Sequence, residues 1–200
     1  MRNILITTLL AVFSLSAFAS IIGLSNHPFT MEKHIVTTEF NNYINNGAGT
    51  GLTARYLQRI NGQLNVDAAA GFTNGERAST MRVGADWMLI PDYGRQPRAS
   101  IKGFLVTESF DGDRINTFGF APTVSKGFAF WGNEAFPYLA LPLSVNMNTE
   151  NETYETATSL ATGISGKLPF GKDLVGNFEL NLPIENSATA FVFGISLPVQ

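Results

Sequence analysis

The sequence predicts an all-β protein that folds as an antiparallel, up-and-down transmembrane β-barrel of eight to ten strands, with ten favoured. Three observations support this prediction. Runs of about ten to thirteen residues alternate between apolar and polar side chains, which is the period of a strand with two unlike faces. Short connections rich in Gly, Asn, Asp and Pro separate the runs, as in antiparallel hairpins. No later run approaches the about 18 apolar residues of a membrane-spanning helix, so any crossing must use strands.

The N-terminus predicts export. A short positive region at Arg2 precedes an apolar core over residues 4–15, and Ala17-Phe18-Ala19 is a small-x-small cleavage site. The alternative is an N-terminal apolar anchor, but the core is too short to span a bilayer as a helix. The predicted organisation is a signal peptide (1–19), an N-terminal periplasmic segment (20–32) and a β-barrel domain (33–200).

Ten runs qualify as strands, and the first is the weakest. Their ranges are 34–44, 51–60, 63–72, 79–90, 98–110, 115–126, 138–148, 154–168, 173–184 and 189–199. In the second to fifth runs, the polar face carries Arg, Lys, Asp and Glu. In the sixth, seventh, eighth and tenth, the polar face is mostly Gly, Ala, Ser and Thr.

The tightest turn predicts a register. Ile60 and Leu64 share a face only if the loop around Asn61-Gly62 has an odd number of residues. We expect a three-residue loop with Gly62 in the left-handed conformation, and we expect Arg55 to lie opposite Asp67.

The composition of the two faces predicts that the apolar face meets lipid. The strands reach the about nine to eleven residues that cross a bilayer. The polar face lacks the Lys and Glu of a solvated surface, and its small side chains suit a narrow lumen that long side chains must share. Aromatic residues near strand ends predict two interfacial girdles. One has Phe72, Phe110, Phe118 and Phe120; the other has Trp87, Tyr93, Phe128, Phe130, Trp131, Phe136, Tyr138 and Phe170.

With its signal peptide, alternating strands such as "QLNVDAAAGF" and "TMRVGADWML", and closing "TAFVFGISLPV", the chain resembles small bacterial outer-membrane β-barrel proteins over residues 33–199. Members of this class usually end in an aromatic residue, whereas this chain ends in Val199-Gln200. The resemblance implies an outer-membrane location, contact with membrane lipids and lipopolysaccharide, and assembly by the barrel-assembly machinery.

The polar residues offer little chemistry. A net charge of −3 gives no basic surface for nucleic acid, and there is no cysteine. His27 and His34 have no sequence pattern that supplies a catalytic partner. Asp111-Gly112-Asp113 and residues 148–152 are typical of hairpin turns rather than of a calcium site, which needs six to eight oxygen ligands. "SGK" at 165–167 lacks the upstream glycines of a phosphate-binding loop. We expect no enzyme activity, cofactor or metal.

The inward-facing charges are more informative, because positive and negative groups balance. A selective pore tends to show one sign at its constriction, whereas buried opposite charges form pairs. The predicted network is Arg55, Arg59, Asp67, Arg82, Asp86, Arg98, Lys102, Glu108, Lys167 and Glu179. We also expect long side chains from the charged wall to reach across to the small-residue wall.

The sequence therefore predicts an integral outer-membrane barrel with a structural role or a narrow passage for small solutes. Two alternatives stay open. One is a secreted or periplasmic soluble β-barrel that binds a hydrophobic ligand. The other is an outer-membrane lipid-modifying enzyme.

Overall fold

The computed structural model describes residues 34–45, 47–130, 133–150, 152–169 and 174–199. The signal peptide and the N-terminal segment lie outside the described residues, and so do Trp131 and Phe170 of the expected girdle. The proposed domain boundaries therefore stay predictions. Within the described ranges, no helix is long and apolar enough to cross a membrane.

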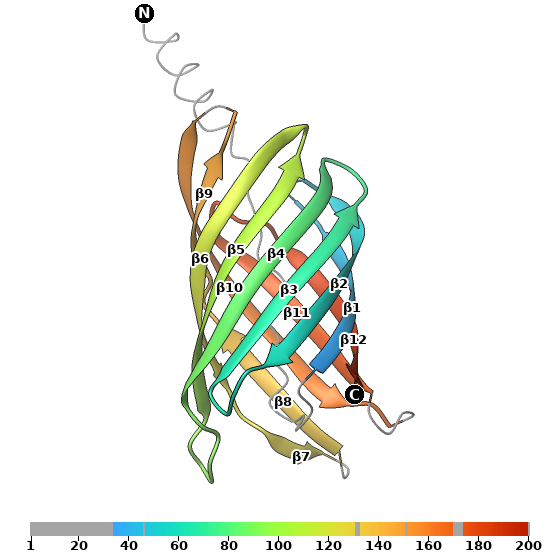
Figure 1. Cartoon of the computed structure of the whole chain (residues 1–200), viewed down its shortest axis with the longest axis vertical. Coiled ribbons are helices and arrows are strands. Elements are labelled where there is room, and N and C mark those ends of the chain that lie inside the picture. The colour runs from blue at the N-terminus through green and yellow to red at the C-terminus, as the bar shows by residue number, and fades with distance from the viewer. Residues whose placement is uncertain (1–33, 46, 131–132, 151, 170–173, 200) are drawn as a thin grey trace, which may run out of the picture.

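Every described element is a strand (Figure 1). In chain order the strands are β1 (His34–Tyr43), β2 (Gly49–Arg59), β3 (Leu64–Thr73), β4 (Arg77–Ile90), β5 (Arg98–Phe110), β6 (Asp113–Ser125), β7 (Phe128–Phe130), β8 (Asn133–Ala140), β9 (Leu143–Asn148), β10 (Thr153–Lys167), β11 (Val175–Glu185) and β12 (Ala190–Val199).

The strands close into an antiparallel barrel. From β1 to β6, each strand pairs with the next one in sequence. β6 then pairs with both β8 and β9, and the ring continues through β10, β11 and β12. It closes where β12 pairs with β1, from His34 opposite Val199 to Tyr43 opposite Ala190. Because β8 and β9 share one position, the ring has ten strands. The favoured strand count is confirmed.

Two departures from the predicted strands occur in the seventh position. The expected strand 138–148 is interrupted at Leu141-Pro142, because proline has no backbone N–H for the ladder. The flanking bonds survive, from Leu141 N to the Pro122 carbonyl and from Ser159 N to the Pro142 carbonyl. Residues expected to form an aromatic connection instead make a hairpin of β7 with the start of β8, which projects below the ring (Figure 1).

The barrel has two distinct ends. β1 begins and β12 finishes at one end, here called the terminal end, with the connections 60–63 and 91–97 (Figure 1). The opposite end, here called the distal end, carries the turns 74–76 and 111–112. Asp111 has a φ of 49° and Gly112 a φ of 91°, the left-handed conformations that this two-residue hairpin turn requires.

The barrel is apolar outside and polar inside. Phe72 is 65% exposed and Met81 69%, whereas Arg55 and Lys102 are each 1% exposed. In water this arrangement would be unfavourable, because apolar side chains are exposed and charged side chains are buried. A lipid bilayer favours the apolar exterior. The architecture is that of a transmembrane β-barrel, and the soluble barrel with an apolar interior is wrong.

The β2–β3 turn confirms part of the expected register. Ile60 N donates to the Leu64 carbonyl, so the loop has three residues. Gly62 does not have a positive φ, however, because the Asn61 side chain shapes the turn by accepting bonds from Gln63 N and Leu64 N. The expectation that Arg55 lies opposite Asp67 is also wrong: this register sets Arg55 opposite Ala69 and Asp67 opposite Leu57.

The aromatic girdles are partly as expected. Six of the expected residues have exposed side chains: Phe72, Phe118, Phe120 and Trp87 on strands of the ring, Tyr93 in a connection, and Phe128 in the β7–β8 hairpin. The expectation that Tyr138 belongs to a girdle is wrong, because this residue shares a face with Ala140 and points into the barrel with 7% exposure. Phe110 packs under the Arg77 guanidinium at the distal end instead of facing lipid.

Candidate functional site

Strand alternation places charged side chains inside the barrel in equal numbers of each sign. Within the described residues, five buried cations face five buried anions. They are Arg55, Arg77, Arg82, Arg98 and Lys102, and Glu39, Asp67, Asp86, Glu108 and Glu179. Nine of the ten lie on β1 to β5, and Glu179 alone lies on β11.

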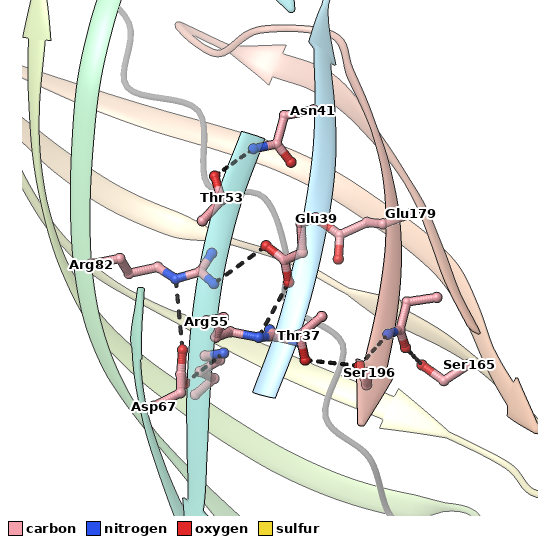
Figure 2. Close-up of polar contacts among 12 residues, drawn as sticks. Thr37, Glu39, Asn41, Thr53, Arg55, Asp67, Arg82, Ser165, Glu179 and Ser196 are labelled. Atoms are coloured by element: carbon pink, nitrogen blue, oxygen red, sulfur yellow. Dashed lines mark hydrogen bonds and ion pairs between the residues drawn. The ribbon is translucent and has the colours of Figure 1, made fainter. Parts of the chain in front are cut away.

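A network of five of these residues, here called the central network, runs along one wall of the lumen (Figure 2). Arg55 Nε lies 3.2 Å from Glu39 Oε1. Arg82 lies between two carboxylates, with Nη2 4.0 Å from Glu39 Oε2 and Nε 3.7 Å from Asp67 Oδ2. Lys102 Nζ approaches Asp67 Oδ1 at 2.9 Å. These side chains join the five strands β1 to β5 of one wall into a single ion-pair network.

A glycine makes the Lys102–Asp67 contact feasible. Gly84 lies on β4, between the strands that carry the two charges, and it pairs with Asp67. A Cβ at Gly84 would lie 3.0 Å from Asp67 Oδ1 and 3.1 Å from Lys102 Cε. Because that space is empty of side chain, the lysine can pass over β4.

Two buried ion pairs of the described residues lie outside this central network. At the distal end, Arg77 Nη1 bonds both oxygens of Glu108, at 2.8 and 2.9 Å. The same guanidinium stacks 4.6 Å from the Tyr43 ring centroid and 5.3 Å from that of Phe110, two cation–π contacts that cover it. Towards the terminal end, Arg98 Nη2 donates to Asp86 Oδ2 at 2.6 Å.

The remaining buried anion has a phenol as partner. Tyr138 Oη on β8 donates to Glu179 Oε2 on β11, crossing β10 at Gly163. A Cβ at Gly163 would lie 2.5 Å from Tyr138 Oη, so this glycine leaves the path open as Gly84 does. The aromatic pattern of the sequence does not predict this contact, although the parity of Tyr138 with Ala140 is a signal for it.

Away from the ion pairs, the wall of the lumen carries two other kinds of contact, and this part is here called the neutral wall. Phe104, Val106, Ala121, Tyr138, Ala140 and Ala161 form a buried apolar cluster. A polar chain runs from Thr37 through Ser196 and Asn177 to Ser165, with bonds of 2.8, 3.0 and 2.6 Å (Figure 2). Apart from Glu179, these described residues line the neutral wall with uncharged groups.

The structure separates the ten predicted site residues into two groups. Eight are buried: Arg55, Asp67, Arg82, Asp86, Arg98, Lys102, Glu108 and Glu179. Arg59 is half-buried at the terminal end, where its Nε donates to the Asn61 carbonyl. Lys167 is exposed at the last residue of β10. The ion pairs join residues on the charged wall. Phe104 packs against Gly119, its direct partner on the neighbouring strand β6, so the expected reach across the lumen stays a prediction.

Beneath the Arg98–Asp86 pair, a cavity of about 540 Å³ opens at the terminal end, here called the vestibule. Its wall includes Arg59 and Arg98 beside the apolar side chains of Leu57, Met88 and Phe136. Such a volume is in the range of about 300–1,000 Å³ common for small-molecule sites.

A latch beside the vestibule ties two connections together. Asp92 accepts bonds from Lys126 Nζ and from the backbone N–H of Gly127, and Lys126 also donates to the Gly94 carbonyl. Partial burial raises the pKa of the Asp92 carboxyl, but the bonds from Lys126 and Gly127 outweigh it and hold the pKa below its usual value. The latch thus favours the charged carboxylate.

The candidates for catalysis and metal binding have ordinary structural surroundings. His34 Nδ1 bonds Tyr56 Oη at 2.6 Å and its ring stacks on the Tyr56 ring, whereas His27 lies outside the described residues. Asp113 accepts a bond from Asn148 between neighbouring strands. Among the described residues, no group of three or more His, Cys, Asp or Glu could hold a metal ion.

The strand pairing, the apolar exterior and the charged interior define this chain as a membrane-type β-barrel. No protein-family model and no curated protein matches the sequence. Among solved structures, it is similar to one described as a de novo design of transmembrane β-barrels, with 14% identity and a TM-score of 0.41, covering 84% of this chain and all of the design. It is also similar to KdgM porin, with 9% identity and a TM-score of 0.41, covering 82% of this chain and 99% of the porin.

Proposed function

We propose that the chain is an integral protein of the bacterial outer membrane, with a narrow, charge-balanced lumen that admits only small solutes. The observation that carries this proposal is the central network. Its five side chains, on Glu39, Arg55, Asp67, Arg82 and Lys102, are at most 7% exposed. A wide aqueous pore would leave them hydrated, so their burial favours a tight constriction.

The membrane orientation follows from the termini. Both ends of the barrel sequence lie at the terminal end, which faces the periplasm if the chain is exported through a signal peptide. Insertion would require the barrel-assembly machinery, and the exposed apolar belt would contact membrane lipids and lipopolysaccharide. The protein would be non-enzymatic, because His34 is held by Tyr56 rather than by an acid or nucleophile.

A proteoliposome swelling assay with glycerol, arabinose and sucrose tests the passage. We expect slow entry of glycerol, weaker entry of arabinose and exclusion of sucrose. Rapid sucrose entry would contradict the constriction. Swelling no faster than that of protein-free liposomes would reject passage altogether.

The same burial favours a second candidate, a purely structural barrel whose interior is closed. This role is distinguished by membrane fractionation and gel mobility. A structural barrel would still fractionate with outer membranes and change its mobility on heating, yet show no swelling. Extraction by aqueous buffer without detergent would reject both candidates, because each requires a lipid-facing surface.

A further inference from the structure

The vestibule at the terminal end is lined by an arginine, Arg98, that makes few contacts with the rest of the described chain. Arg98 is 6% exposed, and its Nη2 donates to Asp86. This is the sole side-chain hydrogen bond of Arg98 within the part of the chain that the structure describes, although a guanidinium carries five N–H donors. Arg98 also lines the vestibule, which places its side chain beside any ligand in that cavity.

A buried arginine with one side-chain hydrogen bond among the described residues favours an anionic ligand. Guanidinium groups bind carboxylates through two parallel N–H···O bonds, and these are stronger when water is largely excluded. Arg59 lines the same cavity and adds a second positive charge. Because Arg98 is hydrogen-bonded to Asp86, the orientation of its guanidinium is fixed before a ligand binds.

The other residues of the vestibule wall indicate that the rest of the ligand is apolar. Leu57, Met88, Phe128 and Phe136 give the vestibule an apolar side. This surface would bury a hydrocarbon group of the ligand, as ligand sites commonly combine apolar walls with a few placed polar groups. A fully hydrated ion such as inorganic phosphate would leave this surface unused.

Two acidic residues of the vestibule indicate that the ligand carries a single negative charge. Asp92 and Glu134 line the vestibule, although Lys126 partly neutralises Asp92. A second carboxylate on the ligand would lie in a cavity that already contains acidic groups, and like charges at short range are unfavourable.

We infer that the vestibule binds small organic monocarboxylates with an apolar body, Arg98 holding the carboxylate. The inference rests on the proposed function, because it names the class of solute held at the inner mouth of the passage. Free acids and lipid-derived acids share this chemistry. Binding is measurable without conduction, so the two proposals can fail separately.

The test is a titration of the full-length protein, folded in a neutral maltoside detergent. Binding is measured by isothermal titration calorimetry and by ligand-observed NMR. Phenylacetate is the probe, and phenylacetamide is its uncharged match. We expect saturable phenylacetate binding and at least about tenfold weaker binding of the amide. Equal binding of both compounds, or no saturable binding of any acid, would overturn the inference.

Variants locate the site. The double variant Arg98→Gln/Asp86→Asn removes both charges together and strands neither, so it should keep its heat-modifiable mobility and bind phenylacetate at least about tenfold more weakly. Arg98→Lys keeps a cation beside Asp86 but loses the planar fork, and it should also weaken binding. Arg114→Gln, at the distal end, is the matched control and should bind normally. Normal binding by both Arg98 variants would place the ligand elsewhere and reject the assignment.

Decanoate distinguishes the source of the acid. If decanoate binds the wild type much more tightly than phenylacetate and loses its affinity in the double variant, the assignment holds with a lipid-derived acid as ligand. If phenylacetate binds as well as decanoate, a free small acid is favoured. Decanoate binding that the double variant leaves unchanged reflects insertion at the apolar belt and counts against the site.

Discussion

Two regions of the lumen use the same device for different contacts. On the charged wall, Lys102 passes over Gly84 to reach Asp67. On the neutral wall, Tyr138 passes over Gly163 to reach Glu179. In both, a glycine on the middle strand lets side chains from its two neighbours meet. The comparison shows that small lumen residues act as spacers that let polar partners on either side meet.

The two regions differ in what is lost when a partner is removed. Asp67 sits between Lys102 and Arg82, so its charge is compensated by two cations. Tyr138 is neutral, and its hydroxyl donates one bond to Glu179. Removing a charge from the first region leaves an opposite charge buried, whereas removing the hydroxyl from the second removes one hydrogen bond. The charged wall should therefore be far more sensitive to substitution.

The largest effect is expected on the charged wall. Arg55→Ala should destabilise the folded barrel by about 3–5 kcal/mol, because Glu39 would lose a buried partner at 3.2 Å. Urea unfolding in lipid vesicles, followed by tryptophan fluorescence, measures the change. Arg114→Ala, an exposed arginine, is the control and should change stability by less than about 0.5 kcal/mol. Equal stability of Arg55→Ala and wild type would show that the network does not support the barrel.

The spacer glycines should rank in the order of their clashes. Gly163→Ala should cost about 1–3 kcal/mol, because the added Cβ would meet Tyr138 Oη at 2.5 Å and a backbone oxygen of β11 that cannot move. Gly84→Ala meets its neighbours at 3.0 Å or more, and should cost about 1 kcal/mol or less. The same vesicle unfolding assay compares them. A reversed order would mean that the space above Gly84 is the more tightly filled.

The phenol contact should be worth less than an ion pair. Tyr138→Phe keeps the ring in the apolar cluster and removes only the donor to Glu179, so we expect a loss of about 1–2 kcal/mol. Unfolding midpoints at fixed denaturant slope test this value. A loss as large as that of Arg55→Ala would erase the distinction between the two walls.

The smallest effect is expected outside both walls, at the latch. Because the pKa of Asp92 is lowered, its contribution should be complete above the usual pKa of the carboxyl and should fade as the pH falls through the lowered value. Asp92→Asn at neutral pH should cost less than about 1 kcal/mol, since the pair is partly exposed. Exchange of the Gly127 amide hydrogen, measured by NMR, should be several-fold faster in this variant. Asp111→Asn, at the distal end, should leave that exchange unchanged.

Much of this fold could be predicted from alternation alone. The parity of Arg82 and Asp86 against Met81 assigns faces correctly, because a strand has a fixed period of two. Pairing partners could not be predicted in the same way. Arg55 pairs with Glu39 rather than with Asp67. An arginine side chain is several bonds long, so strand register alone does not determine which carboxylate it contacts.

The missed residues have equally physical causes. Tyr138 was assigned to a girdle by its position near a strand end, although its parity places it inside. Arg77 precedes the run in which β4 was first recognised, so its pair with Glu108 had no sequence signal. The vestibule depends on a hairpin, β7–β8, that an aromatic connection did not suggest.

Single-channel conductance in planar bilayers tests most directly whether the central network closes the lumen. The wild type should show little or no conductance. The variant Glu39→Ala/Arg55→Ala removes one charge of each sign and two long side chains, and it should show distinctly larger unitary steps, whereas Arg114→Ala should match the wild type. Large unitary steps in the wild type, or none in the double variant while its barrel stays folded, would contradict the claim that these side chains form the constriction.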